Sequence, residues 1–113
     1  MKRIYNQLPQ VAFGILLALS LKERHGYEII KQITEDSDGK IKLSPGALYT
    51  SIKQLNEQGL IKEVEHTEDI RRRYYRLTEA GKKVLGHEVA YYRTSVELAR
   101  ERRILEIGYG TTI

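Results

Sequence analysis

The sequence predicts a mainly helical fold with one small β-hairpin. Apolar residues recur at helical spacing in four stretches, and two short stretches before the last of these are rich in aromatic and β-branched residues. Proline, serine, threonine and glycine stand where these elements should begin or end. With 113 residues, 41% of them apolar and 30% charged, the chain has a globular composition and the length of one domain.

The first helix is expected from about Pro9 to Lys22, because proline suits a first helical turn. Residues 11–21 are apolar on nearly every face, which favours a helix buried on both sides. The same run imitates a secretory signal, since Lys2 and Arg3 precede it and Ala18-Leu19-Ser20 looks like a small-residue cleavage site. Polar residues separate the basic pair from the run, and its 11 residues are too few to span a bilayer, so the buried helix is preferred.

A second helix is expected from about Gly26 to Ser37, with three isoleucines as its buried stripe and a stop at Asp38-Gly39. Tyr27 is expected in the core. His25 precedes this helix and can cap it, stay exposed or touch phosphate, and the first two roles are favoured. Residues 40–43 form a short strand-like stretch.

The third helix should open at Ser44-Pro45, a good N-cap followed by a good first residue, and end at Gly59. Five residues can turn inward at helical spacing: Ala47, Leu48, Ser51, Ile52 and Leu55. The opposite face is polar and rich in hydrogen-bond donors: Gly46, Tyr49, Thr50, Lys53 and Asn56.

Two strands are expected at residues 60–66 and 72–77, joined by a loop of hairpin length. The last helix starts after Thr78 as N-cap and continues to about Ile107. Three helices followed by a hairpin form the winged helix-turn-helix arrangement, here with a long C-terminal helix. The third helix is then the recognition helix and the hairpin is the wing. Residues 1–80 would form a DNA-binding unit and 81–113 a dimerisation helix with a short tail, within one compact domain.

Four motifs connect the chain to a known family. They are Gly26-Tyr27-Glu28-Ile29, Ser44-Pro45-Gly46-Ala47-Leu48-Tyr49, Leu55-Asn56-Glu57-Gln58-Gly59-Leu60-Ile61 and Arg73-Tyr74-Tyr75-Arg76-Leu77-Thr78-Glu79-Ala80-Gly81. In combination, from about Leu16 to Leu85, they resemble the PadR family of transcriptional regulators, in its short form with one C-terminal helix. The resemblance implies a dimeric DNA-binding repressor, often released from its operator by a small molecule.

The wing departs from the family pattern. Family wings commonly carry a glycine-arginine-proline-like sequence before the paired tyrosines, and Asp69-Ile70-Arg71 stands in that region here. Glu68 and Asp69 also bring acid to the tip of the wing. We therefore expect the base of the wing to contact phosphate while its tip stays out of the groove.

Positive charge is concentrated in one segment. The whole chain has a net charge of +4 and an isoelectric point near 9.3, whereas residues 71–83 alone hold six basic residues against one acid, a net charge of +5. Guanidinium groups suit phosphate because they offer a planar fork of donors. Phosphate contact is favoured for Arg72 and Arg73, while Arg71 fits phosphate and plain solvation equally well. Arg76 can instead pair with Glu63 or Glu65 across the hairpin.

On the third helix, Thr50 and Lys53 can reach base edges or phosphates, and plain solvation is the alternative for Lys53. Tyr49 can donate to phosphate or brace the helices. Free N–H groups at the helix start favour phosphate. Gly46 either allows close approach of DNA or relieves crowding against Gly26. The candidate DNA-binding residues are Ser44, Gly46, Tyr49, Thr50, Lys53, Arg71, Arg72 and Arg73.

The last helix carries an apolar seam with spacings of four and three residues. Its members are Leu85, Val89, Tyr92, Val96 and Ala99, a heptad pattern that suits two packed helices. Packing on the first helix of the same chain is the alternative, and we expect both, with Tyr5 and Leu8 extending the interface. A small aromatic or hydrophobic effector could sit near Phe13, Tyr91 and Tyr92, although such rings more often belong to a core.

No enzyme, metal or cofactor is expected. The chain has no cysteine, which excludes disulfides, thiolate zinc sites and a cysteine nucleophile and fits a reducing compartment. His25, His66 and His87 lie in no metal-ligand spacing, the last two are expected at the surface, and no phosphate loop or dinucleotide fingerprint occurs.

The function expected is therefore that of a cytoplasmic homodimeric repressor, without membrane contact. It would bind double-stranded DNA at a pseudo-palindromic operator, because a twofold dimer presents two recognition helices. The alternative is a winged-helix module that uses its basic face on acidic protein surfaces without sequence-specific DNA binding.

Overall fold

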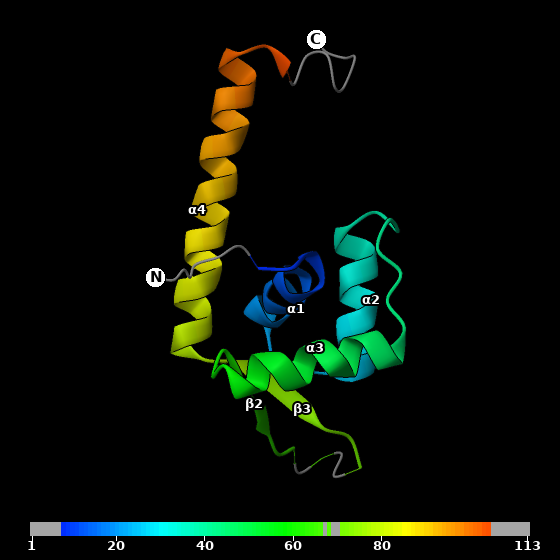
Figure 1. Cartoon of the computed structure of the whole chain (residues 1–113). Coiled ribbons are helices and arrows are strands. Elements are labelled where there is room, and N and C mark those ends of the chain that lie inside the picture. The colour runs from blue at the N-terminus through cyan, green and yellow to red at the C-terminus, as the bar shows by residue number, and fades with distance from the viewer. Residues whose placement is uncertain (1–7, 67, 69–70, 105–113) are drawn as a thin grey trace.

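The computed structural model of the chain describes residues 8–66, 68 and 71–104 (Figure 1). The elements are, in chain order, α1 (Gln10–Leu21), β1 (Arg24–His25), α2 (Gly26–Asp36), α3 (Pro45–Glu57), β2 (Ile61–Val64), β3 (Tyr74–Leu77) and α4 (Glu79–Glu101). The fold is a winged helix with a long C-terminal helix, which confirms the predicted class. Bounds of the first three predicted helices agree with the structure to within one or two residues.

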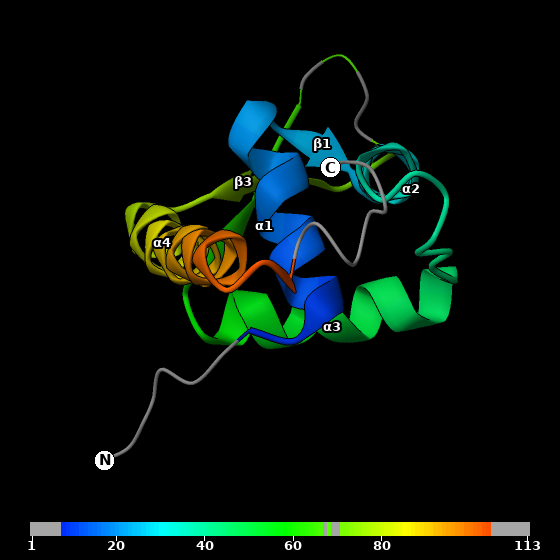
Figure 2. The ribbon, with the colours of Figure 1, turned by 90° about the horizontal axis from the view of Figure 1, so that it is seen from above.

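Helix α1 lies at the centre of the molecule. It packs against α2, α3 and α4, and Figure 2 shows it running between α2 and α4. Its buried residues point to more than one side, as the nearly uniform apolar run predicts; they are Ala12, Ile15, Leu16, Ala18 and Leu19.

Within the described part of the chain, no helix has both the length and the apolar character needed to cross a membrane.

Side chains cap the other three helices as their sequences indicate. The Ser44 and Thr78 hydroxyls accept from the backbone N–H groups of Ala47 and Gly81, and so satisfy donors that α3 and α4 leave open. His25 caps α2, in a capping box completed by Glu28. Local sequence therefore fixes where these helices begin.

A three-stranded antiparallel sheet with the order β1-β3-β2 connects the wing to the helices. In the hairpin, Ile61 pairs with Leu77 and Val64 with Tyr74, while β1 adds its two residues to the other edge of β3. Strand β1 was not predicted, because two residues carry no periodic pattern. Its presence ties the α1–α2 connection directly to the base of the wing.

Several expected boundaries were wrong. Residues 40–43 form no strand, because the sheet offers them no neighbour, and Ile41 and Leu43 pack on the core from an irregular segment. Helix α4 ends at Glu101, not near Ile107, with Arg103 at a positive φ of 64° just beyond its end. The strands are also shorter than predicted, with β2 ending at Val64 and β3 starting at Tyr74.

Two side chains expected inside are exposed. Ala47 lies in the first turn of α3, before the part of that helix that reaches the core. Tyr27 is 67% exposed, because its position at the start of α2 directs it towards the wing and α3. The core of α3 is instead formed by Leu48, Ile52 and Leu55.

Helix α4 packs on the body through its first half, as far as Tyr92, whose ring contacts Phe13 of α1. Leu85 is buried in the core of its own chain, whereas Val89, Tyr92 and Val96 are exposed. The helix then continues away from the other elements, which gives the described chain its dimensions of 51 × 35 × 22 Å (Figure 1). The wing projects from the opposite end of the molecule.

Candidate nucleic-acid interface

The outward face of α3 carries the polar side chains that the sequence assigns to it. Tyr49, Thr50 and Lys53 are exposed, on the side opposite the buried leucines and isoleucine. The Thr50 hydroxyl donates to the Gly46 carbonyl at 3.0 Å, and Ser44 is engaged as the cap. Within the described part of the chain Lys53 has no hydrogen bond or ion pair, so its ammonium group is available to a ligand.

The two glycines of this region have different roles. A Cβ on Gly46 would meet no atom within 4 Å, so Gly46 relieves no crowding and the first turn of α3 is open to close approach. A Cβ on Gly26 would collide with the Tyr49 hydroxyl, and also with Leu48. Tyr49, 47% exposed, therefore leans on the start of α2 and also faces solvent, a position compatible with both roles considered for it.

A concave pocket of about 630 Å³ lies where α2, α3 and the wing meet. It is lined by His25, Gly26, Tyr27, Tyr49, Arg71, Arg72 and Arg73. Three guanidinium groups and the N-terminus of α2 make this pocket electropositive, and the two tyrosine hydroxyls can add hydrogen bonds. Its chemistry suits a phosphate oxygen.

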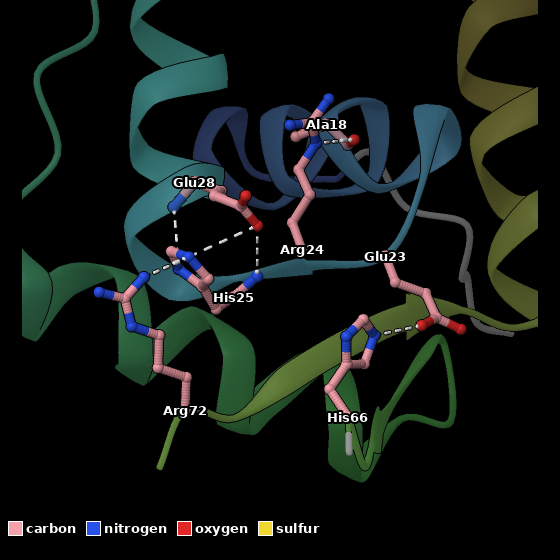
Figure 3. Close-up of polar contacts among 7 residues, drawn as sticks. All are labelled: Ala18, Glu23, Arg24, His25, Glu28, His66 and Arg72. Atoms are coloured by element: carbon pink, nitrogen blue, oxygen red, sulfur yellow. Dashed lines mark hydrogen bonds and ion pairs between the residues drawn. The ribbon is translucent and has the colours of Figure 1, made fainter. Parts of the chain in front are cut away.

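The wing arginines have different partners. Arg72 places its Nη1 group 2.7 Å from Nε2 of His25 (Figure 3). Arg73 is largely exposed, lies 3.9 Å from Glu63 and also interacts with the Tyr75 side chain. Arg76 pairs with Glu23 at 3.6 Å, so the expected pairing with Glu63 or Glu65 was wrong. Glu23 precedes β1, which the sequence had not placed beside the hairpin.

Two histidines brace the wing. His25 is only 6% exposed, and its ring meets the edge of Tyr74 with centroids 5.2 Å apart. His66, expected at the surface, is half-buried. It bonds Glu23 at 2.8 Å (Figure 3), and its ring stacks on Tyr74 with centroids 3.7 Å apart. These contacts join residues more than 40 positions apart, and no local pattern could have revealed them.

One tyrosine of the wing belongs to the core and not to the pocket. Tyr75 is buried on the inner face of β3, and its burial, with the Glu63 carboxylate nearby, raises its pKa. Its hydroxyl therefore stays protonated near neutral pH.

The exposed part of α4 forms a second surface of different character. Val89, Tyr92 and Val96 lie on it with Ala99 partly buried, while Leu85, predicted as the first residue of the seam, belongs to the chain's own core. Leu8 packs partly buried against the core, and Tyr5 lies outside the described residues.

A buried carboxylate, Glu88, holds this surface to the start of the chain. It accepts from the Leu8 N–H at 3.1 Å and from the Tyr92 hydroxyl at 3.4 Å. Partial burial and the Glu88 carboxylate raise the pKa of Tyr92. The sequence offered only a weak signal for this arrangement, the spacing of four residues between Glu88 and Tyr92.

The three aromatic residues considered for an effector do come together. The Phe13 ring lies edge-on to Tyr92 at 5.2 Å between centroids, and Tyr91 meets Tyr92 in the same manner at 5.6 Å. Such geometry stabilises a cluster of rings by itself, so it does not require a ligand.

Comparison with known proteins agrees with this geometry. The profile described as "Transcriptional regulator PadR-like family" matches residues 15–87. Transcriptional regulator YqjI of Escherichia coli is 38% identical over 88 residues, which cover 78% of this chain and 40% of YqjI. The chain thus spans about two fifths of the length of that relative.

Solved structures share the fold. A PadR family transcription regulator from Clostridium difficile is 28% identical with a TM-score of 0.72, covering 82% of this chain and 97% of that one. A Lactococcus lactis ZitR mutant in complex with DNA is 24% identical with a TM-score of 0.63, covering 84% of this chain and 60% of that one, which is a likeness of fold. From the matched profile, and in agreement with the motifs between Leu16 and Leu85, the chain belongs to the PadR-like family of transcriptional regulators.

Proposed function

We propose that this protein is a dimeric, sequence-specific DNA-binding repressor. The observation that supports this most is that Tyr49 of α3 and three wing arginines line one electropositive pocket beside the exposed polar face of α3. A helix of this size fits the major groove, whose width is about 12 Å. The winged-helix fold is also the fold of the ZitR mutant in complex with DNA.

The α3 face and the pocket beside it have different roles in this proposal. In the major groove, Lys53 and Thr50 reach base edges, and the open first turn at Ser44 and Gly46 approaches a phosphate with its backbone N–H groups. Tyr49 and the arginines 71–73 contact phosphates, which position the protein without reading sequence.

Dimerisation would use the exposed apolar residues of α4, Val89, Tyr92 and Val96. Residues 81–113 then act as the dimerisation segment and 1–80 as the DNA-binding unit. A twofold dimer presents two α3 helices and prefers a pseudo-palindromic operator. The cluster of Phe13, Tyr91 and Tyr92 borders this interface, so a small aromatic or hydrophobic effector bound there could release the repressor from DNA in the cytoplasm.

Selection from a random duplex library tests this proposal. We expect the purified protein to enrich an inverted repeat, and the binding constant to fall steeply with salt because phosphate contacts release counterions. A winged-helix module that binds acidic proteins would instead enrich no sequence. That result would contradict the proposed function.

A further inference from the structure

His25 occupies a position that its role as a helix cap does not explain. It contacts the base of the wing in three ways. Its backbone pairs with Tyr74 and its ring meets the Tyr74 ring. Its Nε2 lies 2.7 Å from the Arg72 guanidinium, the contact that Figure 3 shows. The ring is almost fully buried, while Arg72 lines the pocket beside Tyr49. A buried side chain at the N-terminus of α2 thus orients a wing arginine that faces the pocket.

The hydrogen bonds of this ring compete with one another. A neutral imidazole has one acceptor nitrogen, yet Nδ1 of His25 faces the Glu28 N–H at 3.4 Å and Nε2 faces a guanidinium donor at 2.7 Å. The shorter contact favours acceptance from Arg72. A protonated ring has no acceptor, so its bond to Arg72 would break and its charge would face the Glu28 carboxylate, which lies 3.6 Å from Nε2.

We propose that His25 is the positioning residue that orients Arg72, and with it the base of the wing, for phosphate contact, and that protonation of its ring breaks this bond and weakens DNA binding. This inference rests on the proposed function. A guanidinium already held in place gives up less side-chain freedom on binding, an advantage of roughly 2- to 10-fold for each subunit.

Other charged groups face the same ring and affect how readily it is protonated. Glu28 of α2 favours the protonated ring, while Arg72 and the neighbouring Arg71 and Arg73 oppose it. Tyr74 of β3 and Tyr49 of α3 are neutral neighbours. On the far side of Tyr74, protonation of His66 would strengthen its bond to Glu23 and so brace the wing. The two histidines therefore respond to acid in opposite senses.

Two substitutions separate the cap from the wing contact. In His25→Asn the side-chain oxygen can replace Nδ1 as the cap of α2, but the side chain is too short to reach Arg72. In His25→Gln the amide oxygen can take the place of Nε2 as acceptor, and it does not titrate. Both are made in a His66→Gln background, which removes the opposing titration.

The probe is a rhodamine-labelled duplex enriched by the wild-type protein, followed by fluorescence anisotropy from about pH 8 to about pH 5.5. The His66→Gln background protein should bind the duplex more weakly at the acid end of this range. His25→Asn should bind roughly 4- to 100-fold more weakly at pH 8, for a dimer with two wings, and weaken little further in acid. His25→Gln should recover most of that affinity and keep it in acid.

A double-mutant cycle identifies the residue through which His25 acts. Combined with Arg72→Ala, His25→Asn should cost nothing more, whereas with Arg73→Ala the two effects should add. Additive effects with Arg72→Ala, or a His25→Asn variant with unchanged affinity and pH profile, would overturn the proposal. If His25→Asn fails to fold, the comparison is made between His25→Gln and the His66→Gln background protein. Identical pH profiles of DNA binding for these two proteins would contradict the proposed role of His25.

NMR of the free protein gives a measurement that needs no DNA. The Arg72 Nε–H resonance should shift with the same midpoint as the His25 ring, and an Arg72 resonance that ignores this titration would overturn the contact. If the wild-type protein enriches no duplex, the proposed function fails. In that case the NMR titration still reports whether His25 holds Arg72.

Discussion

The wing, residues 61–77, and the outer part of α4, residues 89–101, both present side chains to solvent, but these side chains differ in character. Charged side chains of the wing have partners within the chain, such as Arg76 on Glu23 and His66 on the same carboxylate. Val89, Tyr92 and Val96 of α4 leave apolar surface in water. Such surface costs about 25 cal/mol for each Å² left uncovered. The charges of the wing are thus partly balanced within the chain, whereas the apolar surface of α4 is the surface that the proposed dimer would cover.

Replacing Val96 by aspartate should have the largest effect on this contrast. Val96 is 44% exposed in the single chain, so the substitution should leave the fold intact. In a dimer it would bury an uncompensated charge in each subunit, at about 3 kcal/mol or more, which raises the dimer dissociation constant roughly 100-fold or beyond. Sedimentation velocity should show folded monomer.

Thr94→Asp is the matched control, because Thr94 is exposed on the side of α4 opposite the heptad seam. It should remain dimeric. A Val96→Asp protein that also stays a stable dimer with normal DNA affinity would remove this seam from the interface.

Removing two wing arginines should have the next largest effect. Arg72→Ala with Arg73→Ala should weaken binding to selected and unselected duplexes by a similar factor, because phosphate contacts carry no sequence information. The slope of log affinity against log salt should fall by about 0.9 for each phosphate that is no longer neutralised in each subunit. Anisotropy measured over a series of salt concentrations gives this slope.

A charge-matched control replaces Arg100 and Arg102, at the end of α4 farthest from the wing (Figure 1). Its salt slope should stay near that of the wild type. If the wing pair instead changed the preference at one base-pair step and left the slope alone, the wing would be reading bases.

The smallest expected effect concerns Lys53 and tests whether this residue reads bases or only contacts phosphates. Lys53→Ala should reduce discrimination at its base pair by about 1–3 kcal/mol, while binding to unselected DNA changes little. Competition between the selected duplex and single-base variants measures this. An equal weakening on all sequences would assign Lys53 to phosphate positioning together with the arginines.

Local chemistry explains which parts of the fold could be predicted. Ser44 and Pro45 mark the start of α3 and Gly59 marks its end, so the bounds of this helix follow from sequence. The predicted burial of Ala47 and Tyr27 was wrong, because the neighbouring elements decide which way a side chain in the first turn of a helix faces. The missed strand β1 exists only because β3 lies beside it.

For this protein, the sequence by itself determined the order of helices and hairpin, the caps, the polar face of α3, the concentration of arginine in the wing and the family. These depend on residues close together in the chain, whose spacing is fixed by helix and strand geometry. Only the tertiary structure decided that Arg72 meets His25, that Glu23 serves both His66 and Arg76, and that Glu88 is buried against Leu8. Those contacts join distant segments, and which of many possible partners a charged side chain meets is decided by packing.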